Sequence, residues 1–246
     1  MESFIDKKKK ITHKLSNISK EFHKKHKTKL VHRPCFICGN ETFTFLNKSH
    51  EFYNTVKCNK CLSKRIEPIF NEETLTIFYE DRDCAFKESN NYRKEITKSL
   101  FENYNNAEYY EQLKSQIKFG HYFKKMEKVI NYIKKHNGDS YNILEVGCSY
   151  GLTLLILNKM LKEINKTVNI YGIDLNNEAD YIIENNFSNI KIIPCCPLNK
   201  LKKKLDIKFN LIMAFELIEH VFNFPEFIKD VSDLLDTNGI FYFSTK

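Results

Sequence analysis

Hydrophobic and polar residues follow two different periods in the second half of the chain. Hydrophobic side chains first recur at steps of three and four residues, which predicts an amphipathic helix; they are Phe123, Met126, Val129, Ile130 and Ile133. Five short apolar runs follow, over residues 141–146, 168–174, 190–194, 209–215 and 239–245. Helical patterns separate them, over residues 152–164, 178–187, 198–205 and 224–235. Strands that alternate with helices predict a doubly wound, Rossmann-like α/β fold with a mostly parallel sheet.

The first half of the chain is less regular. Residues 34–66 hold two cysteine pairs around a segment that alternates like a short β hairpin. Residues 67–120 are polar and aromatic, and helices are expected near residues 71–80 and 106–119. We therefore expect four parts: a tail, a cysteine-rich module, a helical linker and an α/β domain, over residues 1–33, 34–66, 67–120 and 121–246 respectively.

Charge is concentrated in the tail. Residues 1–33 contain 11 Lys or Arg and 3 Asp or Glu, whereas the rest of the chain contains 28 of each sign. The tail is either an arm for nucleic acid, which makes RNA a possible partner, or a solvated lysine-rich segment. No run approaches the roughly 18 apolar residues of a membrane helix, and the N-terminus lacks the apolar core of a signal peptide. These features predict a cytoplasmic protein without a membrane partner.

The cysteine pairs have the spacing of a zinc site. Two residues separate Cys35 from Cys38 and Cys58 from Cys61, and 19 residues separate the pairs. Each pair places two thiolates on one tight turn, and two such turns complete a tetrahedron around Zn²⁺. Four cysteines leave no position for a substrate, so the sequence predicts a structural zinc. His32, His50, Cys84, His121, His136 and Cys148 are not expected to be ligands.

A glycine-containing loop follows the first predicted strand of the α/β domain. The segment reads ILEVGCSYG over residues 143–151, in a chain with only seven glycines. Bare backbone here, before a helix, lets a ligand approach the carboxyl end of the sheet and the N–H groups of the helix. The dinucleotide pattern Gly-x-Gly-x-x-Gly fails at two of its three positions. The second strand ends at Asp174, and its carboxylate could accept hydrogen bonds from both hydroxyls of a ribose.

These residues resemble motif I of class I S-adenosylmethionine (SAM) methyltransferases, Glu/Asp-x-Gly-x-Gly-x-Gly. The matching positions are Glu145, Gly147, Ser149 and Gly151, where Ser149 departs from the middle glycine. The resemblance implies that this loop binds SAM and that Asp174 holds the ribose. It gives no assignment for the adenine contact, because Cys195 and Cys196 stand where the family often has an acid or an amide.

The resemblance continues over residues 209–245 and includes Glu216, Glu219 and His220 directly after a strand. In related sugar C-methyltransferases a Glu-His pair here lies beside the substrate, with a Tyr where this chain has Leu217. In some O-methyltransferases the Glu-x-x-Glu-His pattern binds Mg²⁺. A histidine next to a carboxylate is also a suitable general base. We therefore expect His220 and Glu219 to be catalytic, with Mg²⁺ at Glu216, Glu219 and His220 as an alternative.

A zinc module, an aromatic helical linker and motif I together resemble methyltransferases that act on sugars or nucleotide-sugars. This resemblance covers about residues 34–245 and implies methyl transfer to a small-molecule sugar acceptor. It also implies a further helix and a two-stranded hairpin after the fifth strand, which the 246 residues do not include. Two alternatives stay open: an RNA methyltransferase that uses the basic tail, and a SAM-binding fragment without activity.

Overall fold

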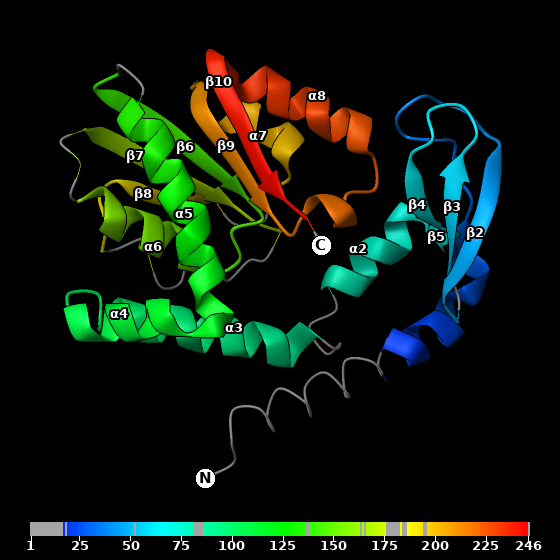
Figure 1. Cartoon of the computed structure of the whole chain (residues 1–246), viewed down its shortest axis with the longest axis horizontal. Coiled ribbons are helices and arrows are strands. Elements are labelled where there is room, and N and C mark those ends of the chain that lie inside the picture. The colour runs from blue at the N-terminus through cyan, green and yellow to red at the C-terminus, as the bar shows by residue number, and fades with distance from the viewer. Residues whose placement is uncertain are drawn as a thin grey trace. The chain divides into compact units, whose positions relative to one another are not determined.

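The computed structural model describes residues 17, 19–51, 53–80, 86–135, 138–162, 164, 166–175, 183, 186–193 and 196–245 (Figure 1). Contacts divide the chain into two compact units. One comprises residues 1–91 with 222–225, and the other comprises residues 92–221 with 226–246. Several predictions fall outside the described residues: the first half of the basic tail, the greater part of the helix over residues 178–187, and Cys84, His136 and Cys195.

The first unit is built on a three-stranded antiparallel sheet. Its strands are β2 (Phe43–His50), β3 (Tyr53–Cys58) and β4 (Lys64–Glu67), in the order β2-β3-β4. The hairpin predicted between the cysteine pairs is therefore present, as β2 and β3. Other elements of this unit are a helix that includes residues 19–26, η1 (Lys27–Lys29), the paired strands β1 (Leu30–Val31) and β5 (Ile69–Phe70), and helix α2 (Glu72–Glu80).

The second unit contains the predicted α/β domain. Its helices are α4 (Ala107–Ser115), α5 (Ile117–Lys135), α6 (Leu152–Leu161), α7 (Leu198–Lys204) and α8 (Phe224–Leu234), and α3 (Phe86–Glu102) contains the boundary between the units. Its strands are β6 (Ser140–Val146), β7 (Thr167–Ile173), β8 (Ile190–Ile193), β9 (Phe209–Phe215) and β10 (Leu235–Ser244). The short 3-10 helix η2 (Ile218–His220) follows β9.

The five strands are parallel, in the order β10-β9-β6-β7-β8. The strand order reverses between β6 and β9, because the chain moves outward from β6 to β8 and then returns to the other side of β6. Ligands of open α/β sheets bind at such a switch point, beyond the carboxyl ends of the strands. The predicted Rossmann-like fold class is confirmed, and the glycine loop lies at the predicted edge of the sheet.

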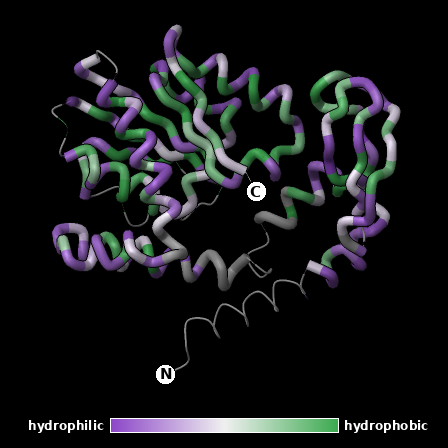
Figure 2. The backbone as a smooth tube through the Cα atoms, viewed as in Figure 1, coloured by the Kyte–Doolittle hydropathy of each residue, from purple (hydrophilic) through white to green (hydrophobic). Residues whose placement is uncertain are grey.

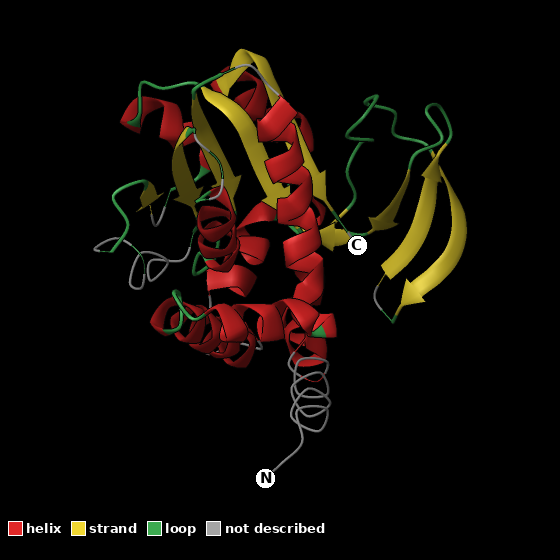
Figure 3. Cartoon of the chain, turned by 60° about the vertical axis from the view of Figure 1, so that its left-hand side comes forward, coloured by secondary structure: helices red, strands yellow, loops and turns green. Residues whose placement is uncertain are grey.

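Helices cover both faces of this sheet, as Figure 3 shows. Ile143 of β6 packs into a core with residues of α5 and α6, whereas its neighbour Leu144 packs into a second core with residues of α7 and α8. Successive residues of a strand point to opposite faces, so a central strand needs hydrophobic residues at almost every position. In Figure 2 hydrophobic stretches follow these central strands.

Two expectations differ from the structure in detail. Leu100, Tyr104 and Leu113 share a core with Phe123, so part of the predicted linker over residues 67–120 packs with the sheet. The four-part division of the chain stays a prediction. The last strand was expected over residues 239–245, but β10 already begins at Leu235 and shifts register before Ile240.

None of the helices in the described part of the chain is both long and apolar enough to cross a membrane.

Candidate cofactor site and four-cysteine cluster

The glycine loop follows β6 and takes an unusual backbone path. Gly147, Ser149 and Gly151 have φ angles of 76°, 51° and 79°, in the left-handed region where glycine is favoured. The backbone N–H groups of Gly147 and Cys148 donate to the carbonyl of Ile173, at 2.8 and 3.1 Å. The end of β7 therefore fixes the start of the loop. Ser149 tolerates a conformation that costs a side-chain-bearing residue about 1–2 kcal/mol.

Two of the predicted cofactor residues are in direct contact. The backbone N–H of Ser149 donates to Oδ2 of Asp174 at 2.7 Å. This hydrogen bond joins the loop after β6 to the end of β7 and fixes the orientation of the carboxylate. The sequence alone placed both residues at the same edge of the sheet, and the structure brings them together.

Both glycines of the loop are packed closely against neighbouring side chains. A Cβ atom added to Gly147 would lie 3.0 Å from Leu217, just after β9, and one added to Gly151 would lie 2.3 Å from Ile183. Neither glycine could carry a side chain without displacing a neighbour. Gly151 is the N-cap residue of α6 and provides no side-chain cap for the first N–H groups of the helix. Backbone donors and bare backbone meet here, which fits a ligand such as SAM.

Glu145 lies below this loop, on the central strand. Its side chain is 3% exposed, and the hydroxyl of Thr153 in α6 donates to its Oε2. Burial raises the pKa of Glu145 to about 8; the Thr153 hydrogen bond and, more weakly, the charge of Lys125 oppose the rise, whereas the charge of Asp174 adds to it. Glu145 is thus mainly protonated at neutral pH before any cation enters the site.

Glu216 follows β9 and is held through one of its two carboxylate oxygens. Its Oε1 accepts hydrogen bonds from Nζ of Lys125 at 3.1 Å and from Oγ of Ser244 at 3.0 Å. Its φ angle is 53°, a left-handed conformation that is rare for a residue with a side chain. Lys125 also lies 4.9 Å from the centre of the Phe215 ring, a cation–π contact. Elements α5, β9 and β10 therefore converge on this carboxylate.

Glu219 and His220 lie on η2 and are exposed. The structure does not bring them together with Glu216 as a metal site. Among the described residues, the only group of three or more ligating side chains close enough to share an ion is the set of four cysteines. The possible Mg²⁺ ligands Glu216, Glu219 and His220 are thus not gathered, because Glu216 turns to Lys125 and Ser244.

The four cysteine sulfurs form the predicted cluster. All four Sγ atoms lie within 4.8 Å of one another, with Cys35 and Cys61 3.5 Å apart and Cys38 and Cys58 3.6 Å apart. A tetrahedral zinc with Zn–S bonds of about 2.3 Å separates its sulfurs by about 3.8 Å. The positions of the sulfurs fit such an ion.

The two cysteine turns are built alike. Gly39 donates its N–H to the carbonyl of Cys35, and Leu62 donates to that of Cys58, at 2.7 and 3.1 Å. Gly39 and Leu62 both have left-handed φ angles, 69° and 62°. The turns therefore have the same backbone shape, although only one of them has glycine at this position.

Hydrogen bonds favour the thiolate form at Cys35 and Cys58 but not at Cys38, where burial and hydrogen bonds to the other three cysteines outweigh the backbone N–H of Asn40 and raise the pKa to about 11. Burial raises the pKa of a thiol, but at Cys35 hydrogen bonds from Ser63 and from the N–H groups of its own turn outweigh burial and lower the pKa to about 6. The pKa of Cys58 is lowered in the same way by N–H groups of the second turn. Thiolates are the form that binds a metal.

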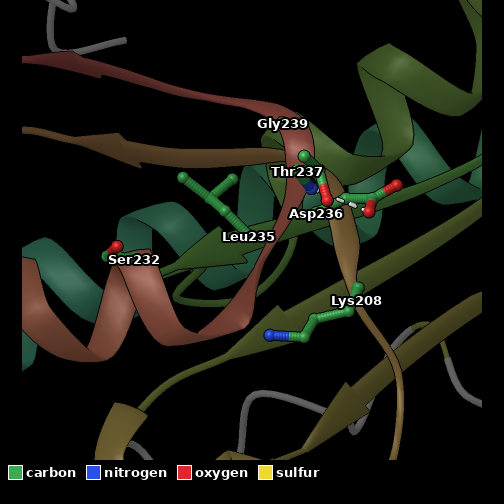
Figure 4. Close-up of a pocket in the computed structure, with 6 residues that line it drawn as sticks. All are labelled: Lys208, Ser232, Leu235, Asp236, Thr237 and Gly239. Carbon is green, nitrogen blue, oxygen red and sulfur yellow. Dashed lines mark hydrogen bonds between the residues drawn. The ribbon is translucent and has the colours of Figure 1, made fainter.

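A shallow cavity of about 550 Å³ lies at the other end of the sheet (Figure 4). It lies near the start of β9 and β10, and its lining residues are Lys208, Ser232, Leu235, Asp236, Thr237 and Gly239. Ser232 belongs to α8 and the other lining residues lie at the amino ends of these strands, away from the glycine loop. The cavity is therefore separate from the candidate cofactor site.

Sequence reasoning missed Thr153 and Lys125. Thr153 had a signal, since it is a polar residue in the apolar first turn of a buried helix. Lys125 had none, because the two lysines at 124 and 125 look alike in the sequence. Only the packing of α5 on the sheet shows that Lys125 reaches Glu216.

Comparison with known proteins identifies the family of the chain. The model of a family described as a methyltransferase domain matches residues 119–246, just over half of the chain. The chain therefore belongs to this methyltransferase family. The matched part contains the sheet, the glycine loop, Asp174 and the segment after β9. No curated protein sequence matches the chain.

Solved structures of methyltransferases show weaker likeness. Coclaurine N-methyltransferase bound to N-methylheliamine and SAH is 17% identical, with a TM-score of 0.39 over 48% of this chain and 35% of that one. The plantazolicin methyltransferase BpumL, in complex with a desmethylPZN analogue and SAH, is 17% identical, with a TM-score of 0.42 over 69% and 55%. The CurJ carbon methyltransferase is 12% identical, with a TM-score of 0.42 over 49% and 33%. The chain thus spans 33% to 55% of the length of these proteins.

Proposed function

We propose that this protein is a SAM-dependent methyltransferase with a small-molecule acceptor. One observation carries the proposal: in a methyltransferase family domain, the left-handed glycine loop, Asp174 and the uncapped start of α6 meet at the switch point of the sheet. Bare backbone and N–H donors suit the amino acid and nucleoside parts of SAM, and an acid at the end of the second strand suits a ribose.

The protein's part in the reaction is binding and orientation. SAM supplies an already activated methyl group, so rate enhancement depends on placing the acceptor in line and excluding water. Asp174 would accept hydrogen bonds from the ribose hydroxyls, with its carboxylate oriented by the N–H of Ser149. Leu217 and the buried loop residue Tyr150 would exclude water from the region around the loop.

His220 is the proposed proton acceptor for the methyl acceptor, with Glu219 beside it. What supports this assignment is position: both residues follow β9 directly, on the side where Leu217 meets the glycine loop, and both are open to an incoming molecule. The ion pair of Lys125 and Glu216 holds the residue at which this segment begins.

A sugar or nucleotide-sugar is the proposed acceptor. This assignment is supported by the order of parts along the chain, a four-cysteine module before a methyltransferase domain, which resembles enzymes acting on such substrates. An RNA acceptor is the alternative outcome of the test below. The net charge of +8 lies within residues 1–33, and the charges of the remaining chain balance.

The four-cysteine cluster is proposed to hold one structural Zn²⁺. The sulfur separations, the two matching turns and the hydrogen bonds that favour the thiolates of Cys35 and Cys58 support it. Four protein ligands complete the usual coordination of zinc, so the ion would stabilise the fold of the module and leave the chemistry to the other unit.

Titration calorimetry tests the proposed function. SAM should bind, and Asp174→Asn should weaken binding by roughly 1–3 kcal/mol, the cost of losing hydrogen bonds to a charged group. Asp206→Asn, at an exposed acid before β9, is the matched control and should leave binding unchanged. Methyl transfer from labelled SAM to nucleotide-sugars and to RNA then identifies the acceptor. Equal SAM affinity in the wild type and the Asp174 variant would reject the ribose assignment, and transfer to RNA alone would reject the sugar.

A further inference from the structure

Four residues from late in the chain belong to the first unit. Residues 222–225 group with residues 1–91, whereas the residues on either side of them belong to the second unit. They begin two residues after His220 and include the start of α8. The contacts that hold them therefore act directly beside the proposed proton acceptor.

Arg33 holds the first of these residues through two contacts. Its Nη1 donates a hydrogen bond to the backbone carbonyl of Phe222. The central carbon of its guanidinium group also lies 4.9 Å from the centre of the Phe222 ring, a cation–π contact. One side chain thus restrains both the backbone and the ring of Phe222.

Phe36 makes a second, independent contact with the same segment. Its ring centre lies 5.5 Å from that of Phe224, with an angle of 68° between the rings, an edge-to-face arrangement. Phe36 lies inside the first cysteine turn, which the hydrogen bond from Gly39 to Cys35 closes. The turn that places two sulfurs in the cluster therefore also places this ring.

The backbone that carries Arg33 is itself held. Arg65 of β4 donates hydrogen bonds to the carbonyls of Arg33 and Pro34, the latter at 2.6 Å. The Arg65 side chain also pairs with Glu67 at 2.9 Å, and neither of these two side chains is more than 6% exposed. Hydrogen bonds that involve charged groups are stronger than neutral ones, so Arg33 extends from a fixed position.

The segment between β9 and α8 is fixed at its other end as well. The backbone N–H of Glu216 donates to the carbonyl of Ser244 at 2.8 Å, and its carboxylate accepts from Lys125 and Ser244. Only five residues separate Glu216 from Phe222. His220 precedes Phe222 by two residues, so their Cα atoms can be no more than about 7 Å apart. With both ends held, η2 has little freedom to move.

We propose that Arg33 and Phe36 are positioning residues, which hold residues 222–225 and thereby keep Glu219 and His220 in place for the methyl acceptor. The inference rests on the proposed function, because it concerns the residues assigned to proton transfer. Neither positioning residue needs to touch a ligand. Their loss should reduce turnover without weakening SAM binding, since SAM is assigned to the glycine loop.

A fluorescent reporter tests whether the segment is held. The chain has no tryptophan, so Phe222→Trp introduces a single one, and tryptophan is the best ring for a cation–π contact with Arg33. In the full chain, adding Arg33→Met or Phe36→Ala should increase the quenching of this tryptophan by acrylamide. Phe36→Tyr keeps the ring and should not. Arg93→Met and Phe45→Ala, at exposed side chains, are the matched controls and should leave quenching unchanged.

Kinetics of the chain without the reporter test the positioning role. Calorimetry should give the same Kd for SAM in the wild type, Arg33→Met and Phe36→Ala. For transfer from labelled SAM to the nucleotide-sugar or RNA that accepts the label, kcat should fall by roughly tenfold or more in both variants, because misplaced groups slow a reaction steeply. Phe36→Tyr should regain kcat. Amide hydrogen exchange over residues 217–224 should accelerate in the same two variants, which repeats the quenching comparison in a chain without the introduced tryptophan.

The outcomes separate the two proposals. Unchanged quenching and unchanged amide exchange in Arg33→Met and Phe36→Ala would overturn the inference, whatever the activity of the protein. Release of the segment with an unchanged kcat would overturn the positioning role. Absence of SAM binding in the wild type would reject the proposed function, while quenching would still decide whether Arg33 and Phe36 hold the segment.

Discussion

The four-cysteine module and the five-stranded sheet both depend on left-handed residues, yet they are stabilised in different ways. In the sheet, positive φ angles at Gly147 and Gly151 form a loop on top of a large hydrophobic core. In the module, the same conformation at Gly39 and Leu62 directs four sulfurs inward, while Ile37, Phe45, Leu62 and Ile66 stay 49–61% exposed. The sheet can fold on buried apolar surface, whereas the module would depend on the proposed zinc.

The largest expected effect is the loss of zinc from the module. We expect one zinc per chain, and a chelator or Cys58→Ser should unfold residues 34–66 while the sheet stays folded. The apparent free energy of structural zinc binding is about 10–16 kcal/mol in small modules, more than the stability of most domains. Elemental analysis and limited proteolysis would measure the loss of metal and of structure.

The control for this experiment is Cys196→Ser, at a buried cysteine outside the cluster, which should keep its zinc. A metal-free protein whose module resists proteolysis as well as the wild type would show that the module folds without zinc and would contradict the proposed difference from the sheet.

The next largest effect concerns how the stability of the sheet depends on pH. The pKa of Glu145 rises from an ordinary value of 4.5 to about 8 on folding. At any pH between these two values, folding is therefore accompanied by uptake of a proton. The free energy of unfolding of the sheet should therefore fall as pH rises from about 4.5 to about 8, and Glu145→Gln should flatten this slope. Thermal unfolding at saturating zinc, followed through the transition of the sheet, would measure this slope.

Glu219→Gln is the control, since Glu219 is exposed on η2. An unchanged slope in Glu145→Gln would show that another group takes up the proton.

A smaller effect is expected from the ion pair beside the site. Lys125 and Glu216 are 15% and 26% exposed, so Lys125→Met should destabilise the sheet by about 1–2 kcal/mol, because a half-buried carboxylate loses its cation. The double variant Lys125→Met/Glu216→Gln should regain most of this loss. Chemical denaturation would measure both variants.

The pair of Lys114 and Glu127 provides a matched control at 3.2 Å with 41% and 44% exposure, and Lys114→Met should cost less than about 1 kcal/mol. Equal losses at the two lysines would mean that burial of the Glu216 pair contributes nothing.

The smallest effect tests the two cysteine turns against each other. Gly39→Ala should destabilise the zinc-bound module by about 1 kcal/mol, because a Cβ there meets no neighbour and only the left-handed backbone is penalised. Leu62→Gly removes the same strain and should be neutral or slightly stabilising. Thermal unfolding of the zinc-bound protein compares them, and destabilisation by Leu62→Gly would mean that its exposed side chain has a packing role.

The sequence predicted the sheet well because its strands are buried on both faces. β9 was predicted residue for residue as 209–215, and the ends of β6, β7 and β8 were predicted to within one residue. The start of β10 was missed by four residues. Gly239 suggested a turn, but its missing side chain instead lets the strand approach the carbonyl of Phe209, where a Cβ would lie at 2.7 Å.

The site was predicted only where local sequence determines it. Loop residues and Asp174 follow strands directly, so their place at the sheet edge could be inferred from alternation alone. The partners of Glu216 could not, since Lys125 is 91 residues away and its reach depends on how α5 packs. Interactions between side chains from distant elements are set by tertiary packing, which one sequence does not show.

The position of β6 at the centre of the sheet also determines when a binding site can exist during synthesis. One edge of β6 pairs with β7, which is synthesised soon afterwards. The other edge pairs with β9, which begins more than sixty residues further along the chain. A nascent chain that has emerged only as far as β8 has the glycine loop and Asp174, yet lacks Leu217 and Glu216. We therefore expect capture of the proposed ligand to be a late event, gained by a ribosome-bound chain only after β9 has left the exit tunnel.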